Sequence, residues 1–251
     1  FAGVSIRPAL LERNFTMAKH LEREIEHLKK KILVLGAKIE SKVQDATLAI
    51  EQRDACLAQQ IIDRDMEIDQ MEVENEEDCL KILALHQPVA IDLRFLISVL
   101  KINSDLERIG DLAVNIAERA LFLAGQPEVP MGFDFITMAQ KAQAMLTQSL
   151  DALVHLDAQA AYRVCAADDQ VDALNRAMYL KVQEGIRKYP QHLESLIHIL
   201  SVSRHLERIA DHATNIAEDV IYMIAGDIVR HKVEEYHKTK QNPANGANPK
   251  S

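Results

Sequence analysis

The chain has 251 residues and a formal net charge of −9, and 48% of its residues are hydrophobic but only 4% are aromatic. The apolar content can fill a substantial core, the negative charge argues against nucleic acid as a partner, and no run of 18 apolar residues predicts a membrane span. The cysteines, an odd number without a Cys-x-x-Cys pair, indicate a reducing cytosol and no thiolate metal site.

The helix-breaking residues glycine and proline are rare, with 8 and 7 in the chain. Long stretches rich in Ala, Leu, Ile, Glu, Lys and Gln predict an all-α protein with six long helices. In chain order, we predict helices over residues 15–55, 57–86, 89–124, 133–156, 159–188 and 191–225. Pro88 and Pro190 account for the turns before the third and sixth helices, because proline cannot continue a helix there. We expect an irregular lead over 1–16, three-helix bundles over 17–126 and 131–228, and a disordered tail over 231–251.

The second half of the chain repeats the first. Residues 106–118 (Leu-Glu-Arg-Ile-Gly-Asp-Leu-Ala-Val-Asn-Ile-Ala-Glu) match residues 206–218 at ten of thirteen positions, at an offset of 100. Residues 65–69 match 168–172 more weakly, at an offset of 103. The repeat indicates a tandem duplication of one three-helix bundle, and two such bundles joined by a short linker predict a long rod or arch.

Each copy carries two acidic pairs with the spacing acid-x-x-x-acid, which places both side chains of a pair on one helix face. Asp69 lies 19 residues before Pro88 and Glu107 lies 19 after it, while Asp65 and Asp111 each lie 23 away. In an antiparallel hairpin the two pairs are therefore level. Counted from Pro190, the two pairs of the second copy are level to within one residue. The predicted ligands are Asp65, Asp69, Glu107, Asp111, Asp168, Asp172, Glu207 and Asp211.

Carboxylates gathered in this way repel one another unless they are protonated or bind a cation, so we predict a metal site in each copy. Oxygen ligands suit iron, manganese, magnesium or calcium. The site is expected on the bundle surface rather than in a buried ferritin-type centre. Further candidates continue the acidic stripes, supply amide oxygens or orient carboxylates: Asn115, Asn215, Glu118, Glu218, Arg108 and Arg208.

One alternative weighs against this prediction. A single acid-x-x-x-acid pair on a helix usually marks a solvated face, and only the repetition of the pairs in register favours a metal site. His205 and His212 have no histidine counterparts in the first copy, and we expect them to be core or surface residues rather than ligands.

The two copies of the signature, Leu106-Glu-Arg-Ile-Gly-Asp111 and Leu206-Glu-Arg-Ile-Ala-Asp211, strongly resemble the PhoU family. The resemblance extends over about residues 17–226 and implies a homodimer of paired three-helix bundles. It further implies surface clusters of iron, with manganese, magnesium, zinc, nickel or calcium as other possible occupants, held by the eight acids above.

The resemblance also implies a function. Proteins of this family are negative regulators of phosphate uptake and phosphate-starvation signalling. They act with the phosphate ABC transporter, through its ATPase subunit, and with the phosphate sensor histidine kinase. This implies a cytoplasmic protein that is peripheral to the inner membrane and meets it only through partners.

Three functional interpretations remain open on the sequence. The first is the non-enzymatic, metal-binding regulator, and the second is a helical adaptor without metal. The third, an enzyme with a di-iron carboxylate centre, is disfavoured because such centres normally use Glu-x-x-His pairs, and the third residue after Glu107 is Gly110 and after Glu207 is Ala210.

Overall fold

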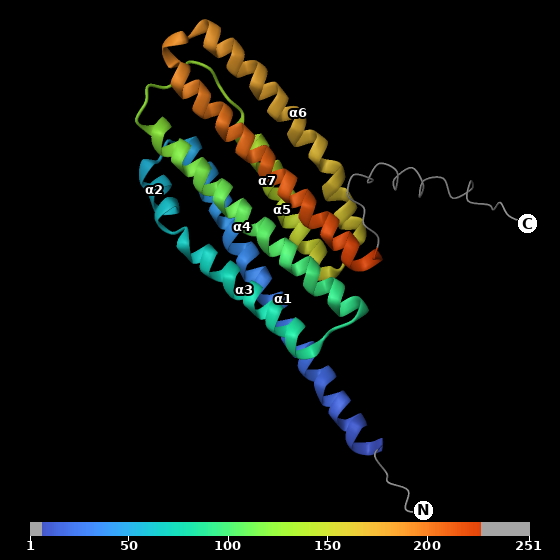
Figure 1. The fold of residues 1–251 in the computed structure, drawn as a ribbon. Helices are drawn as coiled ribbons and strands as arrows, with labels where there is room; N and C mark the ends of the chain where they lie inside the picture. The colour runs from blue at the N-terminus through green and yellow to red at the C-terminus, as the bar shows by residue number, and fades with distance from the viewer. Residues whose placement is uncertain (1–6, 227–251) are drawn as a thin grey trace, which may run out of the picture.

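The computed structural model describes residues 7–226, with side chains described from residue 19 onward, and all regular structure in this part of the chain is helical (Figure 1). The helices are α1 (Arg7–Gln52), α2 (Ala55–Asp63), α3 (Met66–His86), α4 (Ala90–Ala124), α5 (Phe135–His155), α6 (Ala158–Lys188) and α7 (Leu193–Ala225). A single 3-10 turn, Pro190–His192, precedes α7. The tail predicted to be disordered, 231–251, lies outside the described residues. None of the described helices is long and apolar enough to cross a membrane.

Two helix boundaries differ from the prediction. Helix α1 begins at Arg7, inside the expected irregular lead, because Pro8 fits the first turn of a helix and good helix formers follow it. The second predicted helix is broken after Asp63 into α2 and α3. At the equivalent position α6 runs on without a break, since Ala166 and Ala167 stand where the first copy has Asp63 and Arg64, and alanine is the stronger helix former.

Matching caps confirm the duplication at the level of local structure. Asp54 caps α2 by accepting hydrogen bonds from the backbone N–H groups of Cys56 and Leu57. Asp157, 103 positions later, caps α6 in the same way. Each side chain satisfies donors that the first helical turn leaves unpaired.

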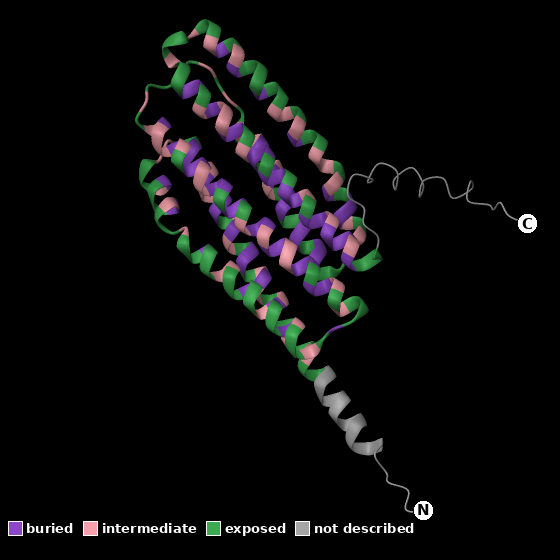
Figure 2. Ribbon diagram, viewed as in Figure 1, coloured by how far each residue is buried: buried purple, intermediate pink, exposed green. Residues whose placement is uncertain are grey.

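The two bundles lie side by side rather than end to end, which corrects the expected rod (Figure 1). Helices α1 to α4 form the first bundle and α5 to α7 the second, and they share one core through the packing of α4 on α7 and of α1 on α5. The reason is the width of the buried face on α4 and α7 (Figure 2). Neighbouring pairs such as Leu112 and Ala113 are both buried on α4, so one face contacts its own bundle and the next contacts the other.

Candidate metal centre

The first acidic cluster lies between α3 and α4, on the outer side of the first bundle. Asp65 precedes α3, Asp69 lies in its first turn, and Glu107 and Asp111 lie on α4. One carboxylate oxygen from each of Asp65, Asp69 and Asp111 lies within 4.8 Å of the other two. Asp69 and Asp111 are exposed and Asp65 is half-buried. The antiparallel register therefore brings Asp65 to Asp111, as counting from Pro88 predicts, whereas Glu107, the predicted partner of Asp69, is not among the three converging acids.

The carboxylates of this cluster raise one another's pKa. Burial raises the pKa of Asp111 first, and the charges of Asp65 and Asp69 raise it further. Burial likewise raises the pKa of Glu107, followed by the charges of Asp111 and Glu72. The cluster thus holds more negative charge than its surroundings neutralise.

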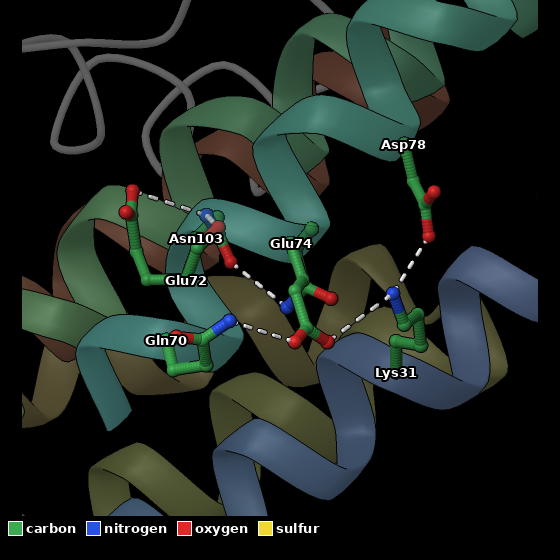
Figure 3. Close-up of polar contacts among 7 residues, drawn as sticks. Lys31, Gln70, Glu72, Glu74, Asp78 and Asn103 are labelled. Atoms are coloured by element: carbon green, nitrogen blue, oxygen red, sulfur yellow. Dashed lines mark hydrogen bonds and ion pairs between the residues drawn. The ribbon is translucent and has the colours of Figure 1, made fainter. Parts of the chain in front are cut away.

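Helix α3 is held in this register by polar contacts on its other sides (Figure 3). Asn103 of α4 is buried, and its amide nitrogen donates to the backbone oxygen of Glu72 at 2.9 Å and to a carboxylate oxygen of Glu72 at 3.2 Å. Lys31 of α1 pairs with Asp78 at 2.7 Å. These contacts place Glu72 beside the cluster, and the pKa of Glu72 is raised by burial and then by the charges of Glu76 and Asp69.

One charged member of this cluster, Lys42 of α1, was not predicted from the sequence. Its side chain is 8% exposed, and its ammonium group forms an ion pair with Asp65. Its positive charge also lowers the pKa of Asp111 against the larger opposing effects. The sequence does contain an indication of its burial, because Lys42 lies in the apolar seam of α1 between the buried residues Ile39 and Ala46.

The second cluster lies between α6 and α7 and consists of Asp168, Asp172, Glu207 and Asp211. Burial, followed by the charges of Asp211 and Asp172, raises the pKa of Asp168 to about 6. The pKa of Asp211 is raised by burial and by Asp172, and that of Glu207 by burial and by Asp211. Each carboxylate therefore acts on others of the same cluster. Among the described residues, however, only Asp65, Asp69 and Asp111 of the first cluster bring one oxygen each within 4.8 Å of the other two.

Two exposed arginines reach the second cluster from its rim. Arg204 donates to Glu207 Oε1 at 2.7 Å, and Arg176 donates to Asp172 Oδ2 at 3.3 Å. Glu207 itself is 8% exposed, and its Oε2 is buried without a hydrogen-bond partner among the described residues. A buried carboxylate oxygen without a partner is unfavourable, and a cation would satisfy it.

The additional candidates divide between the two sides of α4 and α7. Arg108 and Arg208 are exposed, and their charges oppose the raised pKa values of Glu107 and Asp211. Asn115 donates to the backbone oxygen of Asp111, at 2.9 Å. These three therefore lie beside the acidic clusters.

Asn215 does not join the second cluster, which corrects its assignment. It donates to Asp105 Oδ1 of α4 at 3.4 Å, because the packing of α7 on α4 turns this position toward the other bundle. Glu118 pairs with Arg119 at 3.4 Å, and the charge of Glu218 raises the pKa of Cys165 on α6.

The two histidines lie between the bundles. His212 is buried, and its Nδ1 lies 2.8 Å from Asp105 Oδ1. His205 contacts Ser201 through Nε2 at 3.1 Å, and burial lowers its pKa to about 4. The structure thus gives both histidines contacts other than the carboxylates of the acidic clusters.

Comparison with known proteins gives one consistent result. The family model described as the PhoU domain matches residues 32–120 and again 135–220. The "phosphate-specific transport system accessory protein PhoU homolog" of Pseudomonas aeruginosa is 38% identical over 216 residues, covering 86% of this chain and 89% of the relative. The homolog of Clostridium acetobutylicum is 35% identical over 209 residues, covering 83% and 95%.

Solved structures agree with the sequence matches. The crystal structure of PhoU from Pseudomonas aeruginosa superposes with a TM-score of 0.80 at 38% identity, over 82% of this chain and 99% of that one. The phosphate transport system regulatory protein PhoU from Streptococcus pneumoniae gives a TM-score of 0.77 at 30% identity, over 83% and 99%. The matches cover both copies of the repeat and most of the chain, and the protein belongs to the PhoU family.

Proposed function

We propose that this protein is a non-enzymatic negative regulator of phosphate uptake and of phosphate-starvation signalling. It acts on the ATPase subunit of the phosphate ABC transporter and on the phosphate sensor histidine kinase, at the cytoplasmic face of the inner membrane, as a homodimer. The observation that carries this proposal is the match of both repeats to the PhoU domain, together with relatives that are named for the phosphate-specific transport system.

The proposal includes a metal centre in each copy, with iron as the first expectation and manganese, magnesium, zinc, nickel or calcium as alternatives. The donor set fits such ions because it consists of carboxylate oxygens. Asp65, Asp69 and Asp111 converge within 4.8 Å, and Glu207 Oε2 is buried without a partner among the described residues. Bound metal would neutralise the mutual repulsion that raises the pKa values in both clusters.

Exposed apolar side chains on the helix faces that carry the clusters, ten or more residues along each helix, support binding to partner proteins. Leu93 and Ile97 are 40% and 37% exposed on α4, and they lie on the same helix face as Glu107 and Asp111. Their counterparts Leu193 and Ile197 are 45% and 55% exposed on α7. A regulator that docks on membrane-associated partners accounts for apolar residues kept at the same exposed positions in both repeats.

A di-iron carboxylate oxidase is less well supported. Its ligands would face the bundle interior and include histidine. Asp69, Asp111 and Asp211 are exposed instead, and His205 and His212 make their contacts between the bundles.

The test replaces one acid pair in each copy, as E107Q/D111N/E207Q/D211N. Elemental analysis of protein purified without a nickel column, a phosphate-starvation reporter and light scattering are the measurements. We expect loss of metal and loss of repression by phosphate, with helicity kept. The exposed acids Glu77 and Asp151, one in each copy, replaced as E77Q/D151N, are the matched control.

Two results would favour other functions. Repression that persists without metal would favour the metal-free adaptor. Repression that also survives I97E/I197E, which places charge on both apolar stripes, would contradict docking through these surfaces. A monomer by light scattering would remove the homodimer from the proposal.

A further inference from the structure

The duplication allows the two clusters to be compared residue by residue. At the offset of 103 that relates Asp54 to Asp157, Lys38 corresponds to Lys141 and Glu67 to Gln170. The contacts correspond too, since Lys38 pairs with Glu67 and Lys141 donates to Gln170 at 2.8 Å. The packing of α1 on α3 is therefore repeated by the packing of α5 on α6.

By the same correspondence, Lys42 of α1 matches Met145 of α5. Both residues are buried, with exposed fractions of 8% and 3%. Lys42 ion-pairs with Asp65, one of the three converging carboxylates, and its charge also acts on a second, Asp111. At the corresponding position of the second copy the side chain is therefore a buried, uncharged thioether.

The cations that reach the second cluster differ in kind. Arg204 and Arg176 have side chains that are 62% and 68% exposed, and they approach from the solvent side. Water screens such pairs, and their side chains can turn away at little cost. Lys42 is enclosed, and separating it from Asp65 leaves a buried charge without its partner.

We propose that Lys42 is a built-in counter-cation that makes the two metal centres unequal, so that the first binds divalent metal more weakly than the second. This inference rests on the proposed metal function. A divalent ion entering the first cluster meets the repulsion of the ammonium group and competes with it for Asp65. The second centre then retains its metal ion, and the first centre exchanges its metal ion with the surroundings.

The experiment measures each centre alone, in full-length protein stripped with a chelator. D172N/D211N disables the second centre, and Mn²⁺ added to this protein is followed through the electron paramagnetic resonance signal of the free ion. Adding K42M is expected to tighten Mn²⁺ binding on the order of tenfold, which corresponds to about 1.4 kcal/mol. K42R keeps the charge and is the matched control, with little change expected. Equal dissociation constants with and without K42M would overturn the inference.

The converse substitution is M145K, in protein whose first centre is disabled by D69N/D111N. Weaker Mn²⁺ binding, again on the order of tenfold, is expected if an ammonium group at this position opposes metal. Circular dichroism establishes that M145K folds, and if it does not, K42M decides alone. Mn²⁺ binding that K42M leaves unchanged refutes only the inequality. Failure of both single-centre proteins to bind any Mn²⁺ refutes the metal centres and the inequality together.

Discussion

Asp168 shows what the acidic clusters do to the protein in the absence of a bound cation. Its pKa rises to about 6 because burial and the charges of Asp211 and Asp172 disfavour its ionised form. At neutral pH this side chain is nevertheless ionised, so its charge opposes folding. A residue selected for stability alone would be apolar or neutral here, so an acid at this position is consistent with the proposed metal centre.

The pH dependence of stability follows from the direction of this shift. The folded protein binds the Asp168 proton more tightly than the unfolded chain does, whose pKa is near 3.8. The free energy of unfolding therefore falls as pH rises from about 4 to about 6. D168N removes this contribution and should stabilise the metal-free protein at pH 7, on the order of 1 kcal/mol after allowance for screening of a half-exposed group. Urea unfolding of chelator-treated protein at several pH values measures it. Parallel pH profiles for the two proteins would contradict the assignment.

At single residues, helical spacing predicts some members of the first cluster and not others. Asp65, Asp69 and Asp111 could be brought together on paper, because helical spacing and one turn fix their register. Lys42 could not be placed in this way, because its contact with Asp65 depends on how α1 packs against α3. Counting residues from a turn between helices does not give that packing. Asn215 was misplaced for a related reason, because the α4–α7 contact that captures it follows from the packing of the bundles.

At the scale of helices, α4 and α7 pack as an antiparallel, nearly symmetric pair. Lys101 pairs with Asp219 at 2.9 Å, and the counterpart residues 100 positions away, Ser201 and Arg119, meet at 3.5 Å. The symmetry is broken where Asp105 meets His212, because the counterpart of His212 is Leu112 and that of Asp105 is His205. The duplicated helices have thus diverged at the positions where they contact each other.

This buried pair makes a prediction for stability. D105L removes the acceptor that serves His212 and Asn215, so the unpaired groups should lower the free energy of unfolding by about 1–3 kcal/mol. D105L/H212L replaces both members with the residue type that the first copy has at Leu112, and should recover most of that loss. Urea unfolding of both variants and of H212L completes a double-mutant cycle. Additive losses in the double variant would show that the two side chains do not interact.

Helix boundaries were predictable where proline or a strong break sets them, as at Pro88 and Pro190. The break after Asp63 was not, because Asp63 and Arg64 only weaken a helix that the duplicated sequence continues through alanines. The break has a consequence for the first centre, because it places Asp65 just before the start of α3. The equivalent residue of the second centre, Asp168, lies inside α6.

For the whole molecule, the core shared by the two bundles was not predicted from the apolar pattern. The seam through Leu106, Ile109 and Ala113 predicts one buried face on α4, which suits a single bundle. The adjacent buried positions, among them Asp105 and Leu112, form a second face directed at the other bundle. Two faces on one helix mean that neither bundle is complete without its neighbour.

Separating the bundles tests this dependence. If the chain is divided in the linker, into residues 1–127 and 128–251, each fragment exposes the apolar face that the other covers, and we expect a 1:1 complex when both are produced together. A symmetric dimer of the first fragment is disfavoured, because an α4–α4 pair in the same register places Lys101 against Arg119 and leaves Asp105 facing Leu112. Light scattering of the mixed and separate fragments measures the outcome, and D219A, which removes the partner of Lys101, should weaken the complex. Two fragments that are monomeric and fully helical when apart would show that each bundle has a core of its own and that the contact between α4 and α7 is not needed for folding.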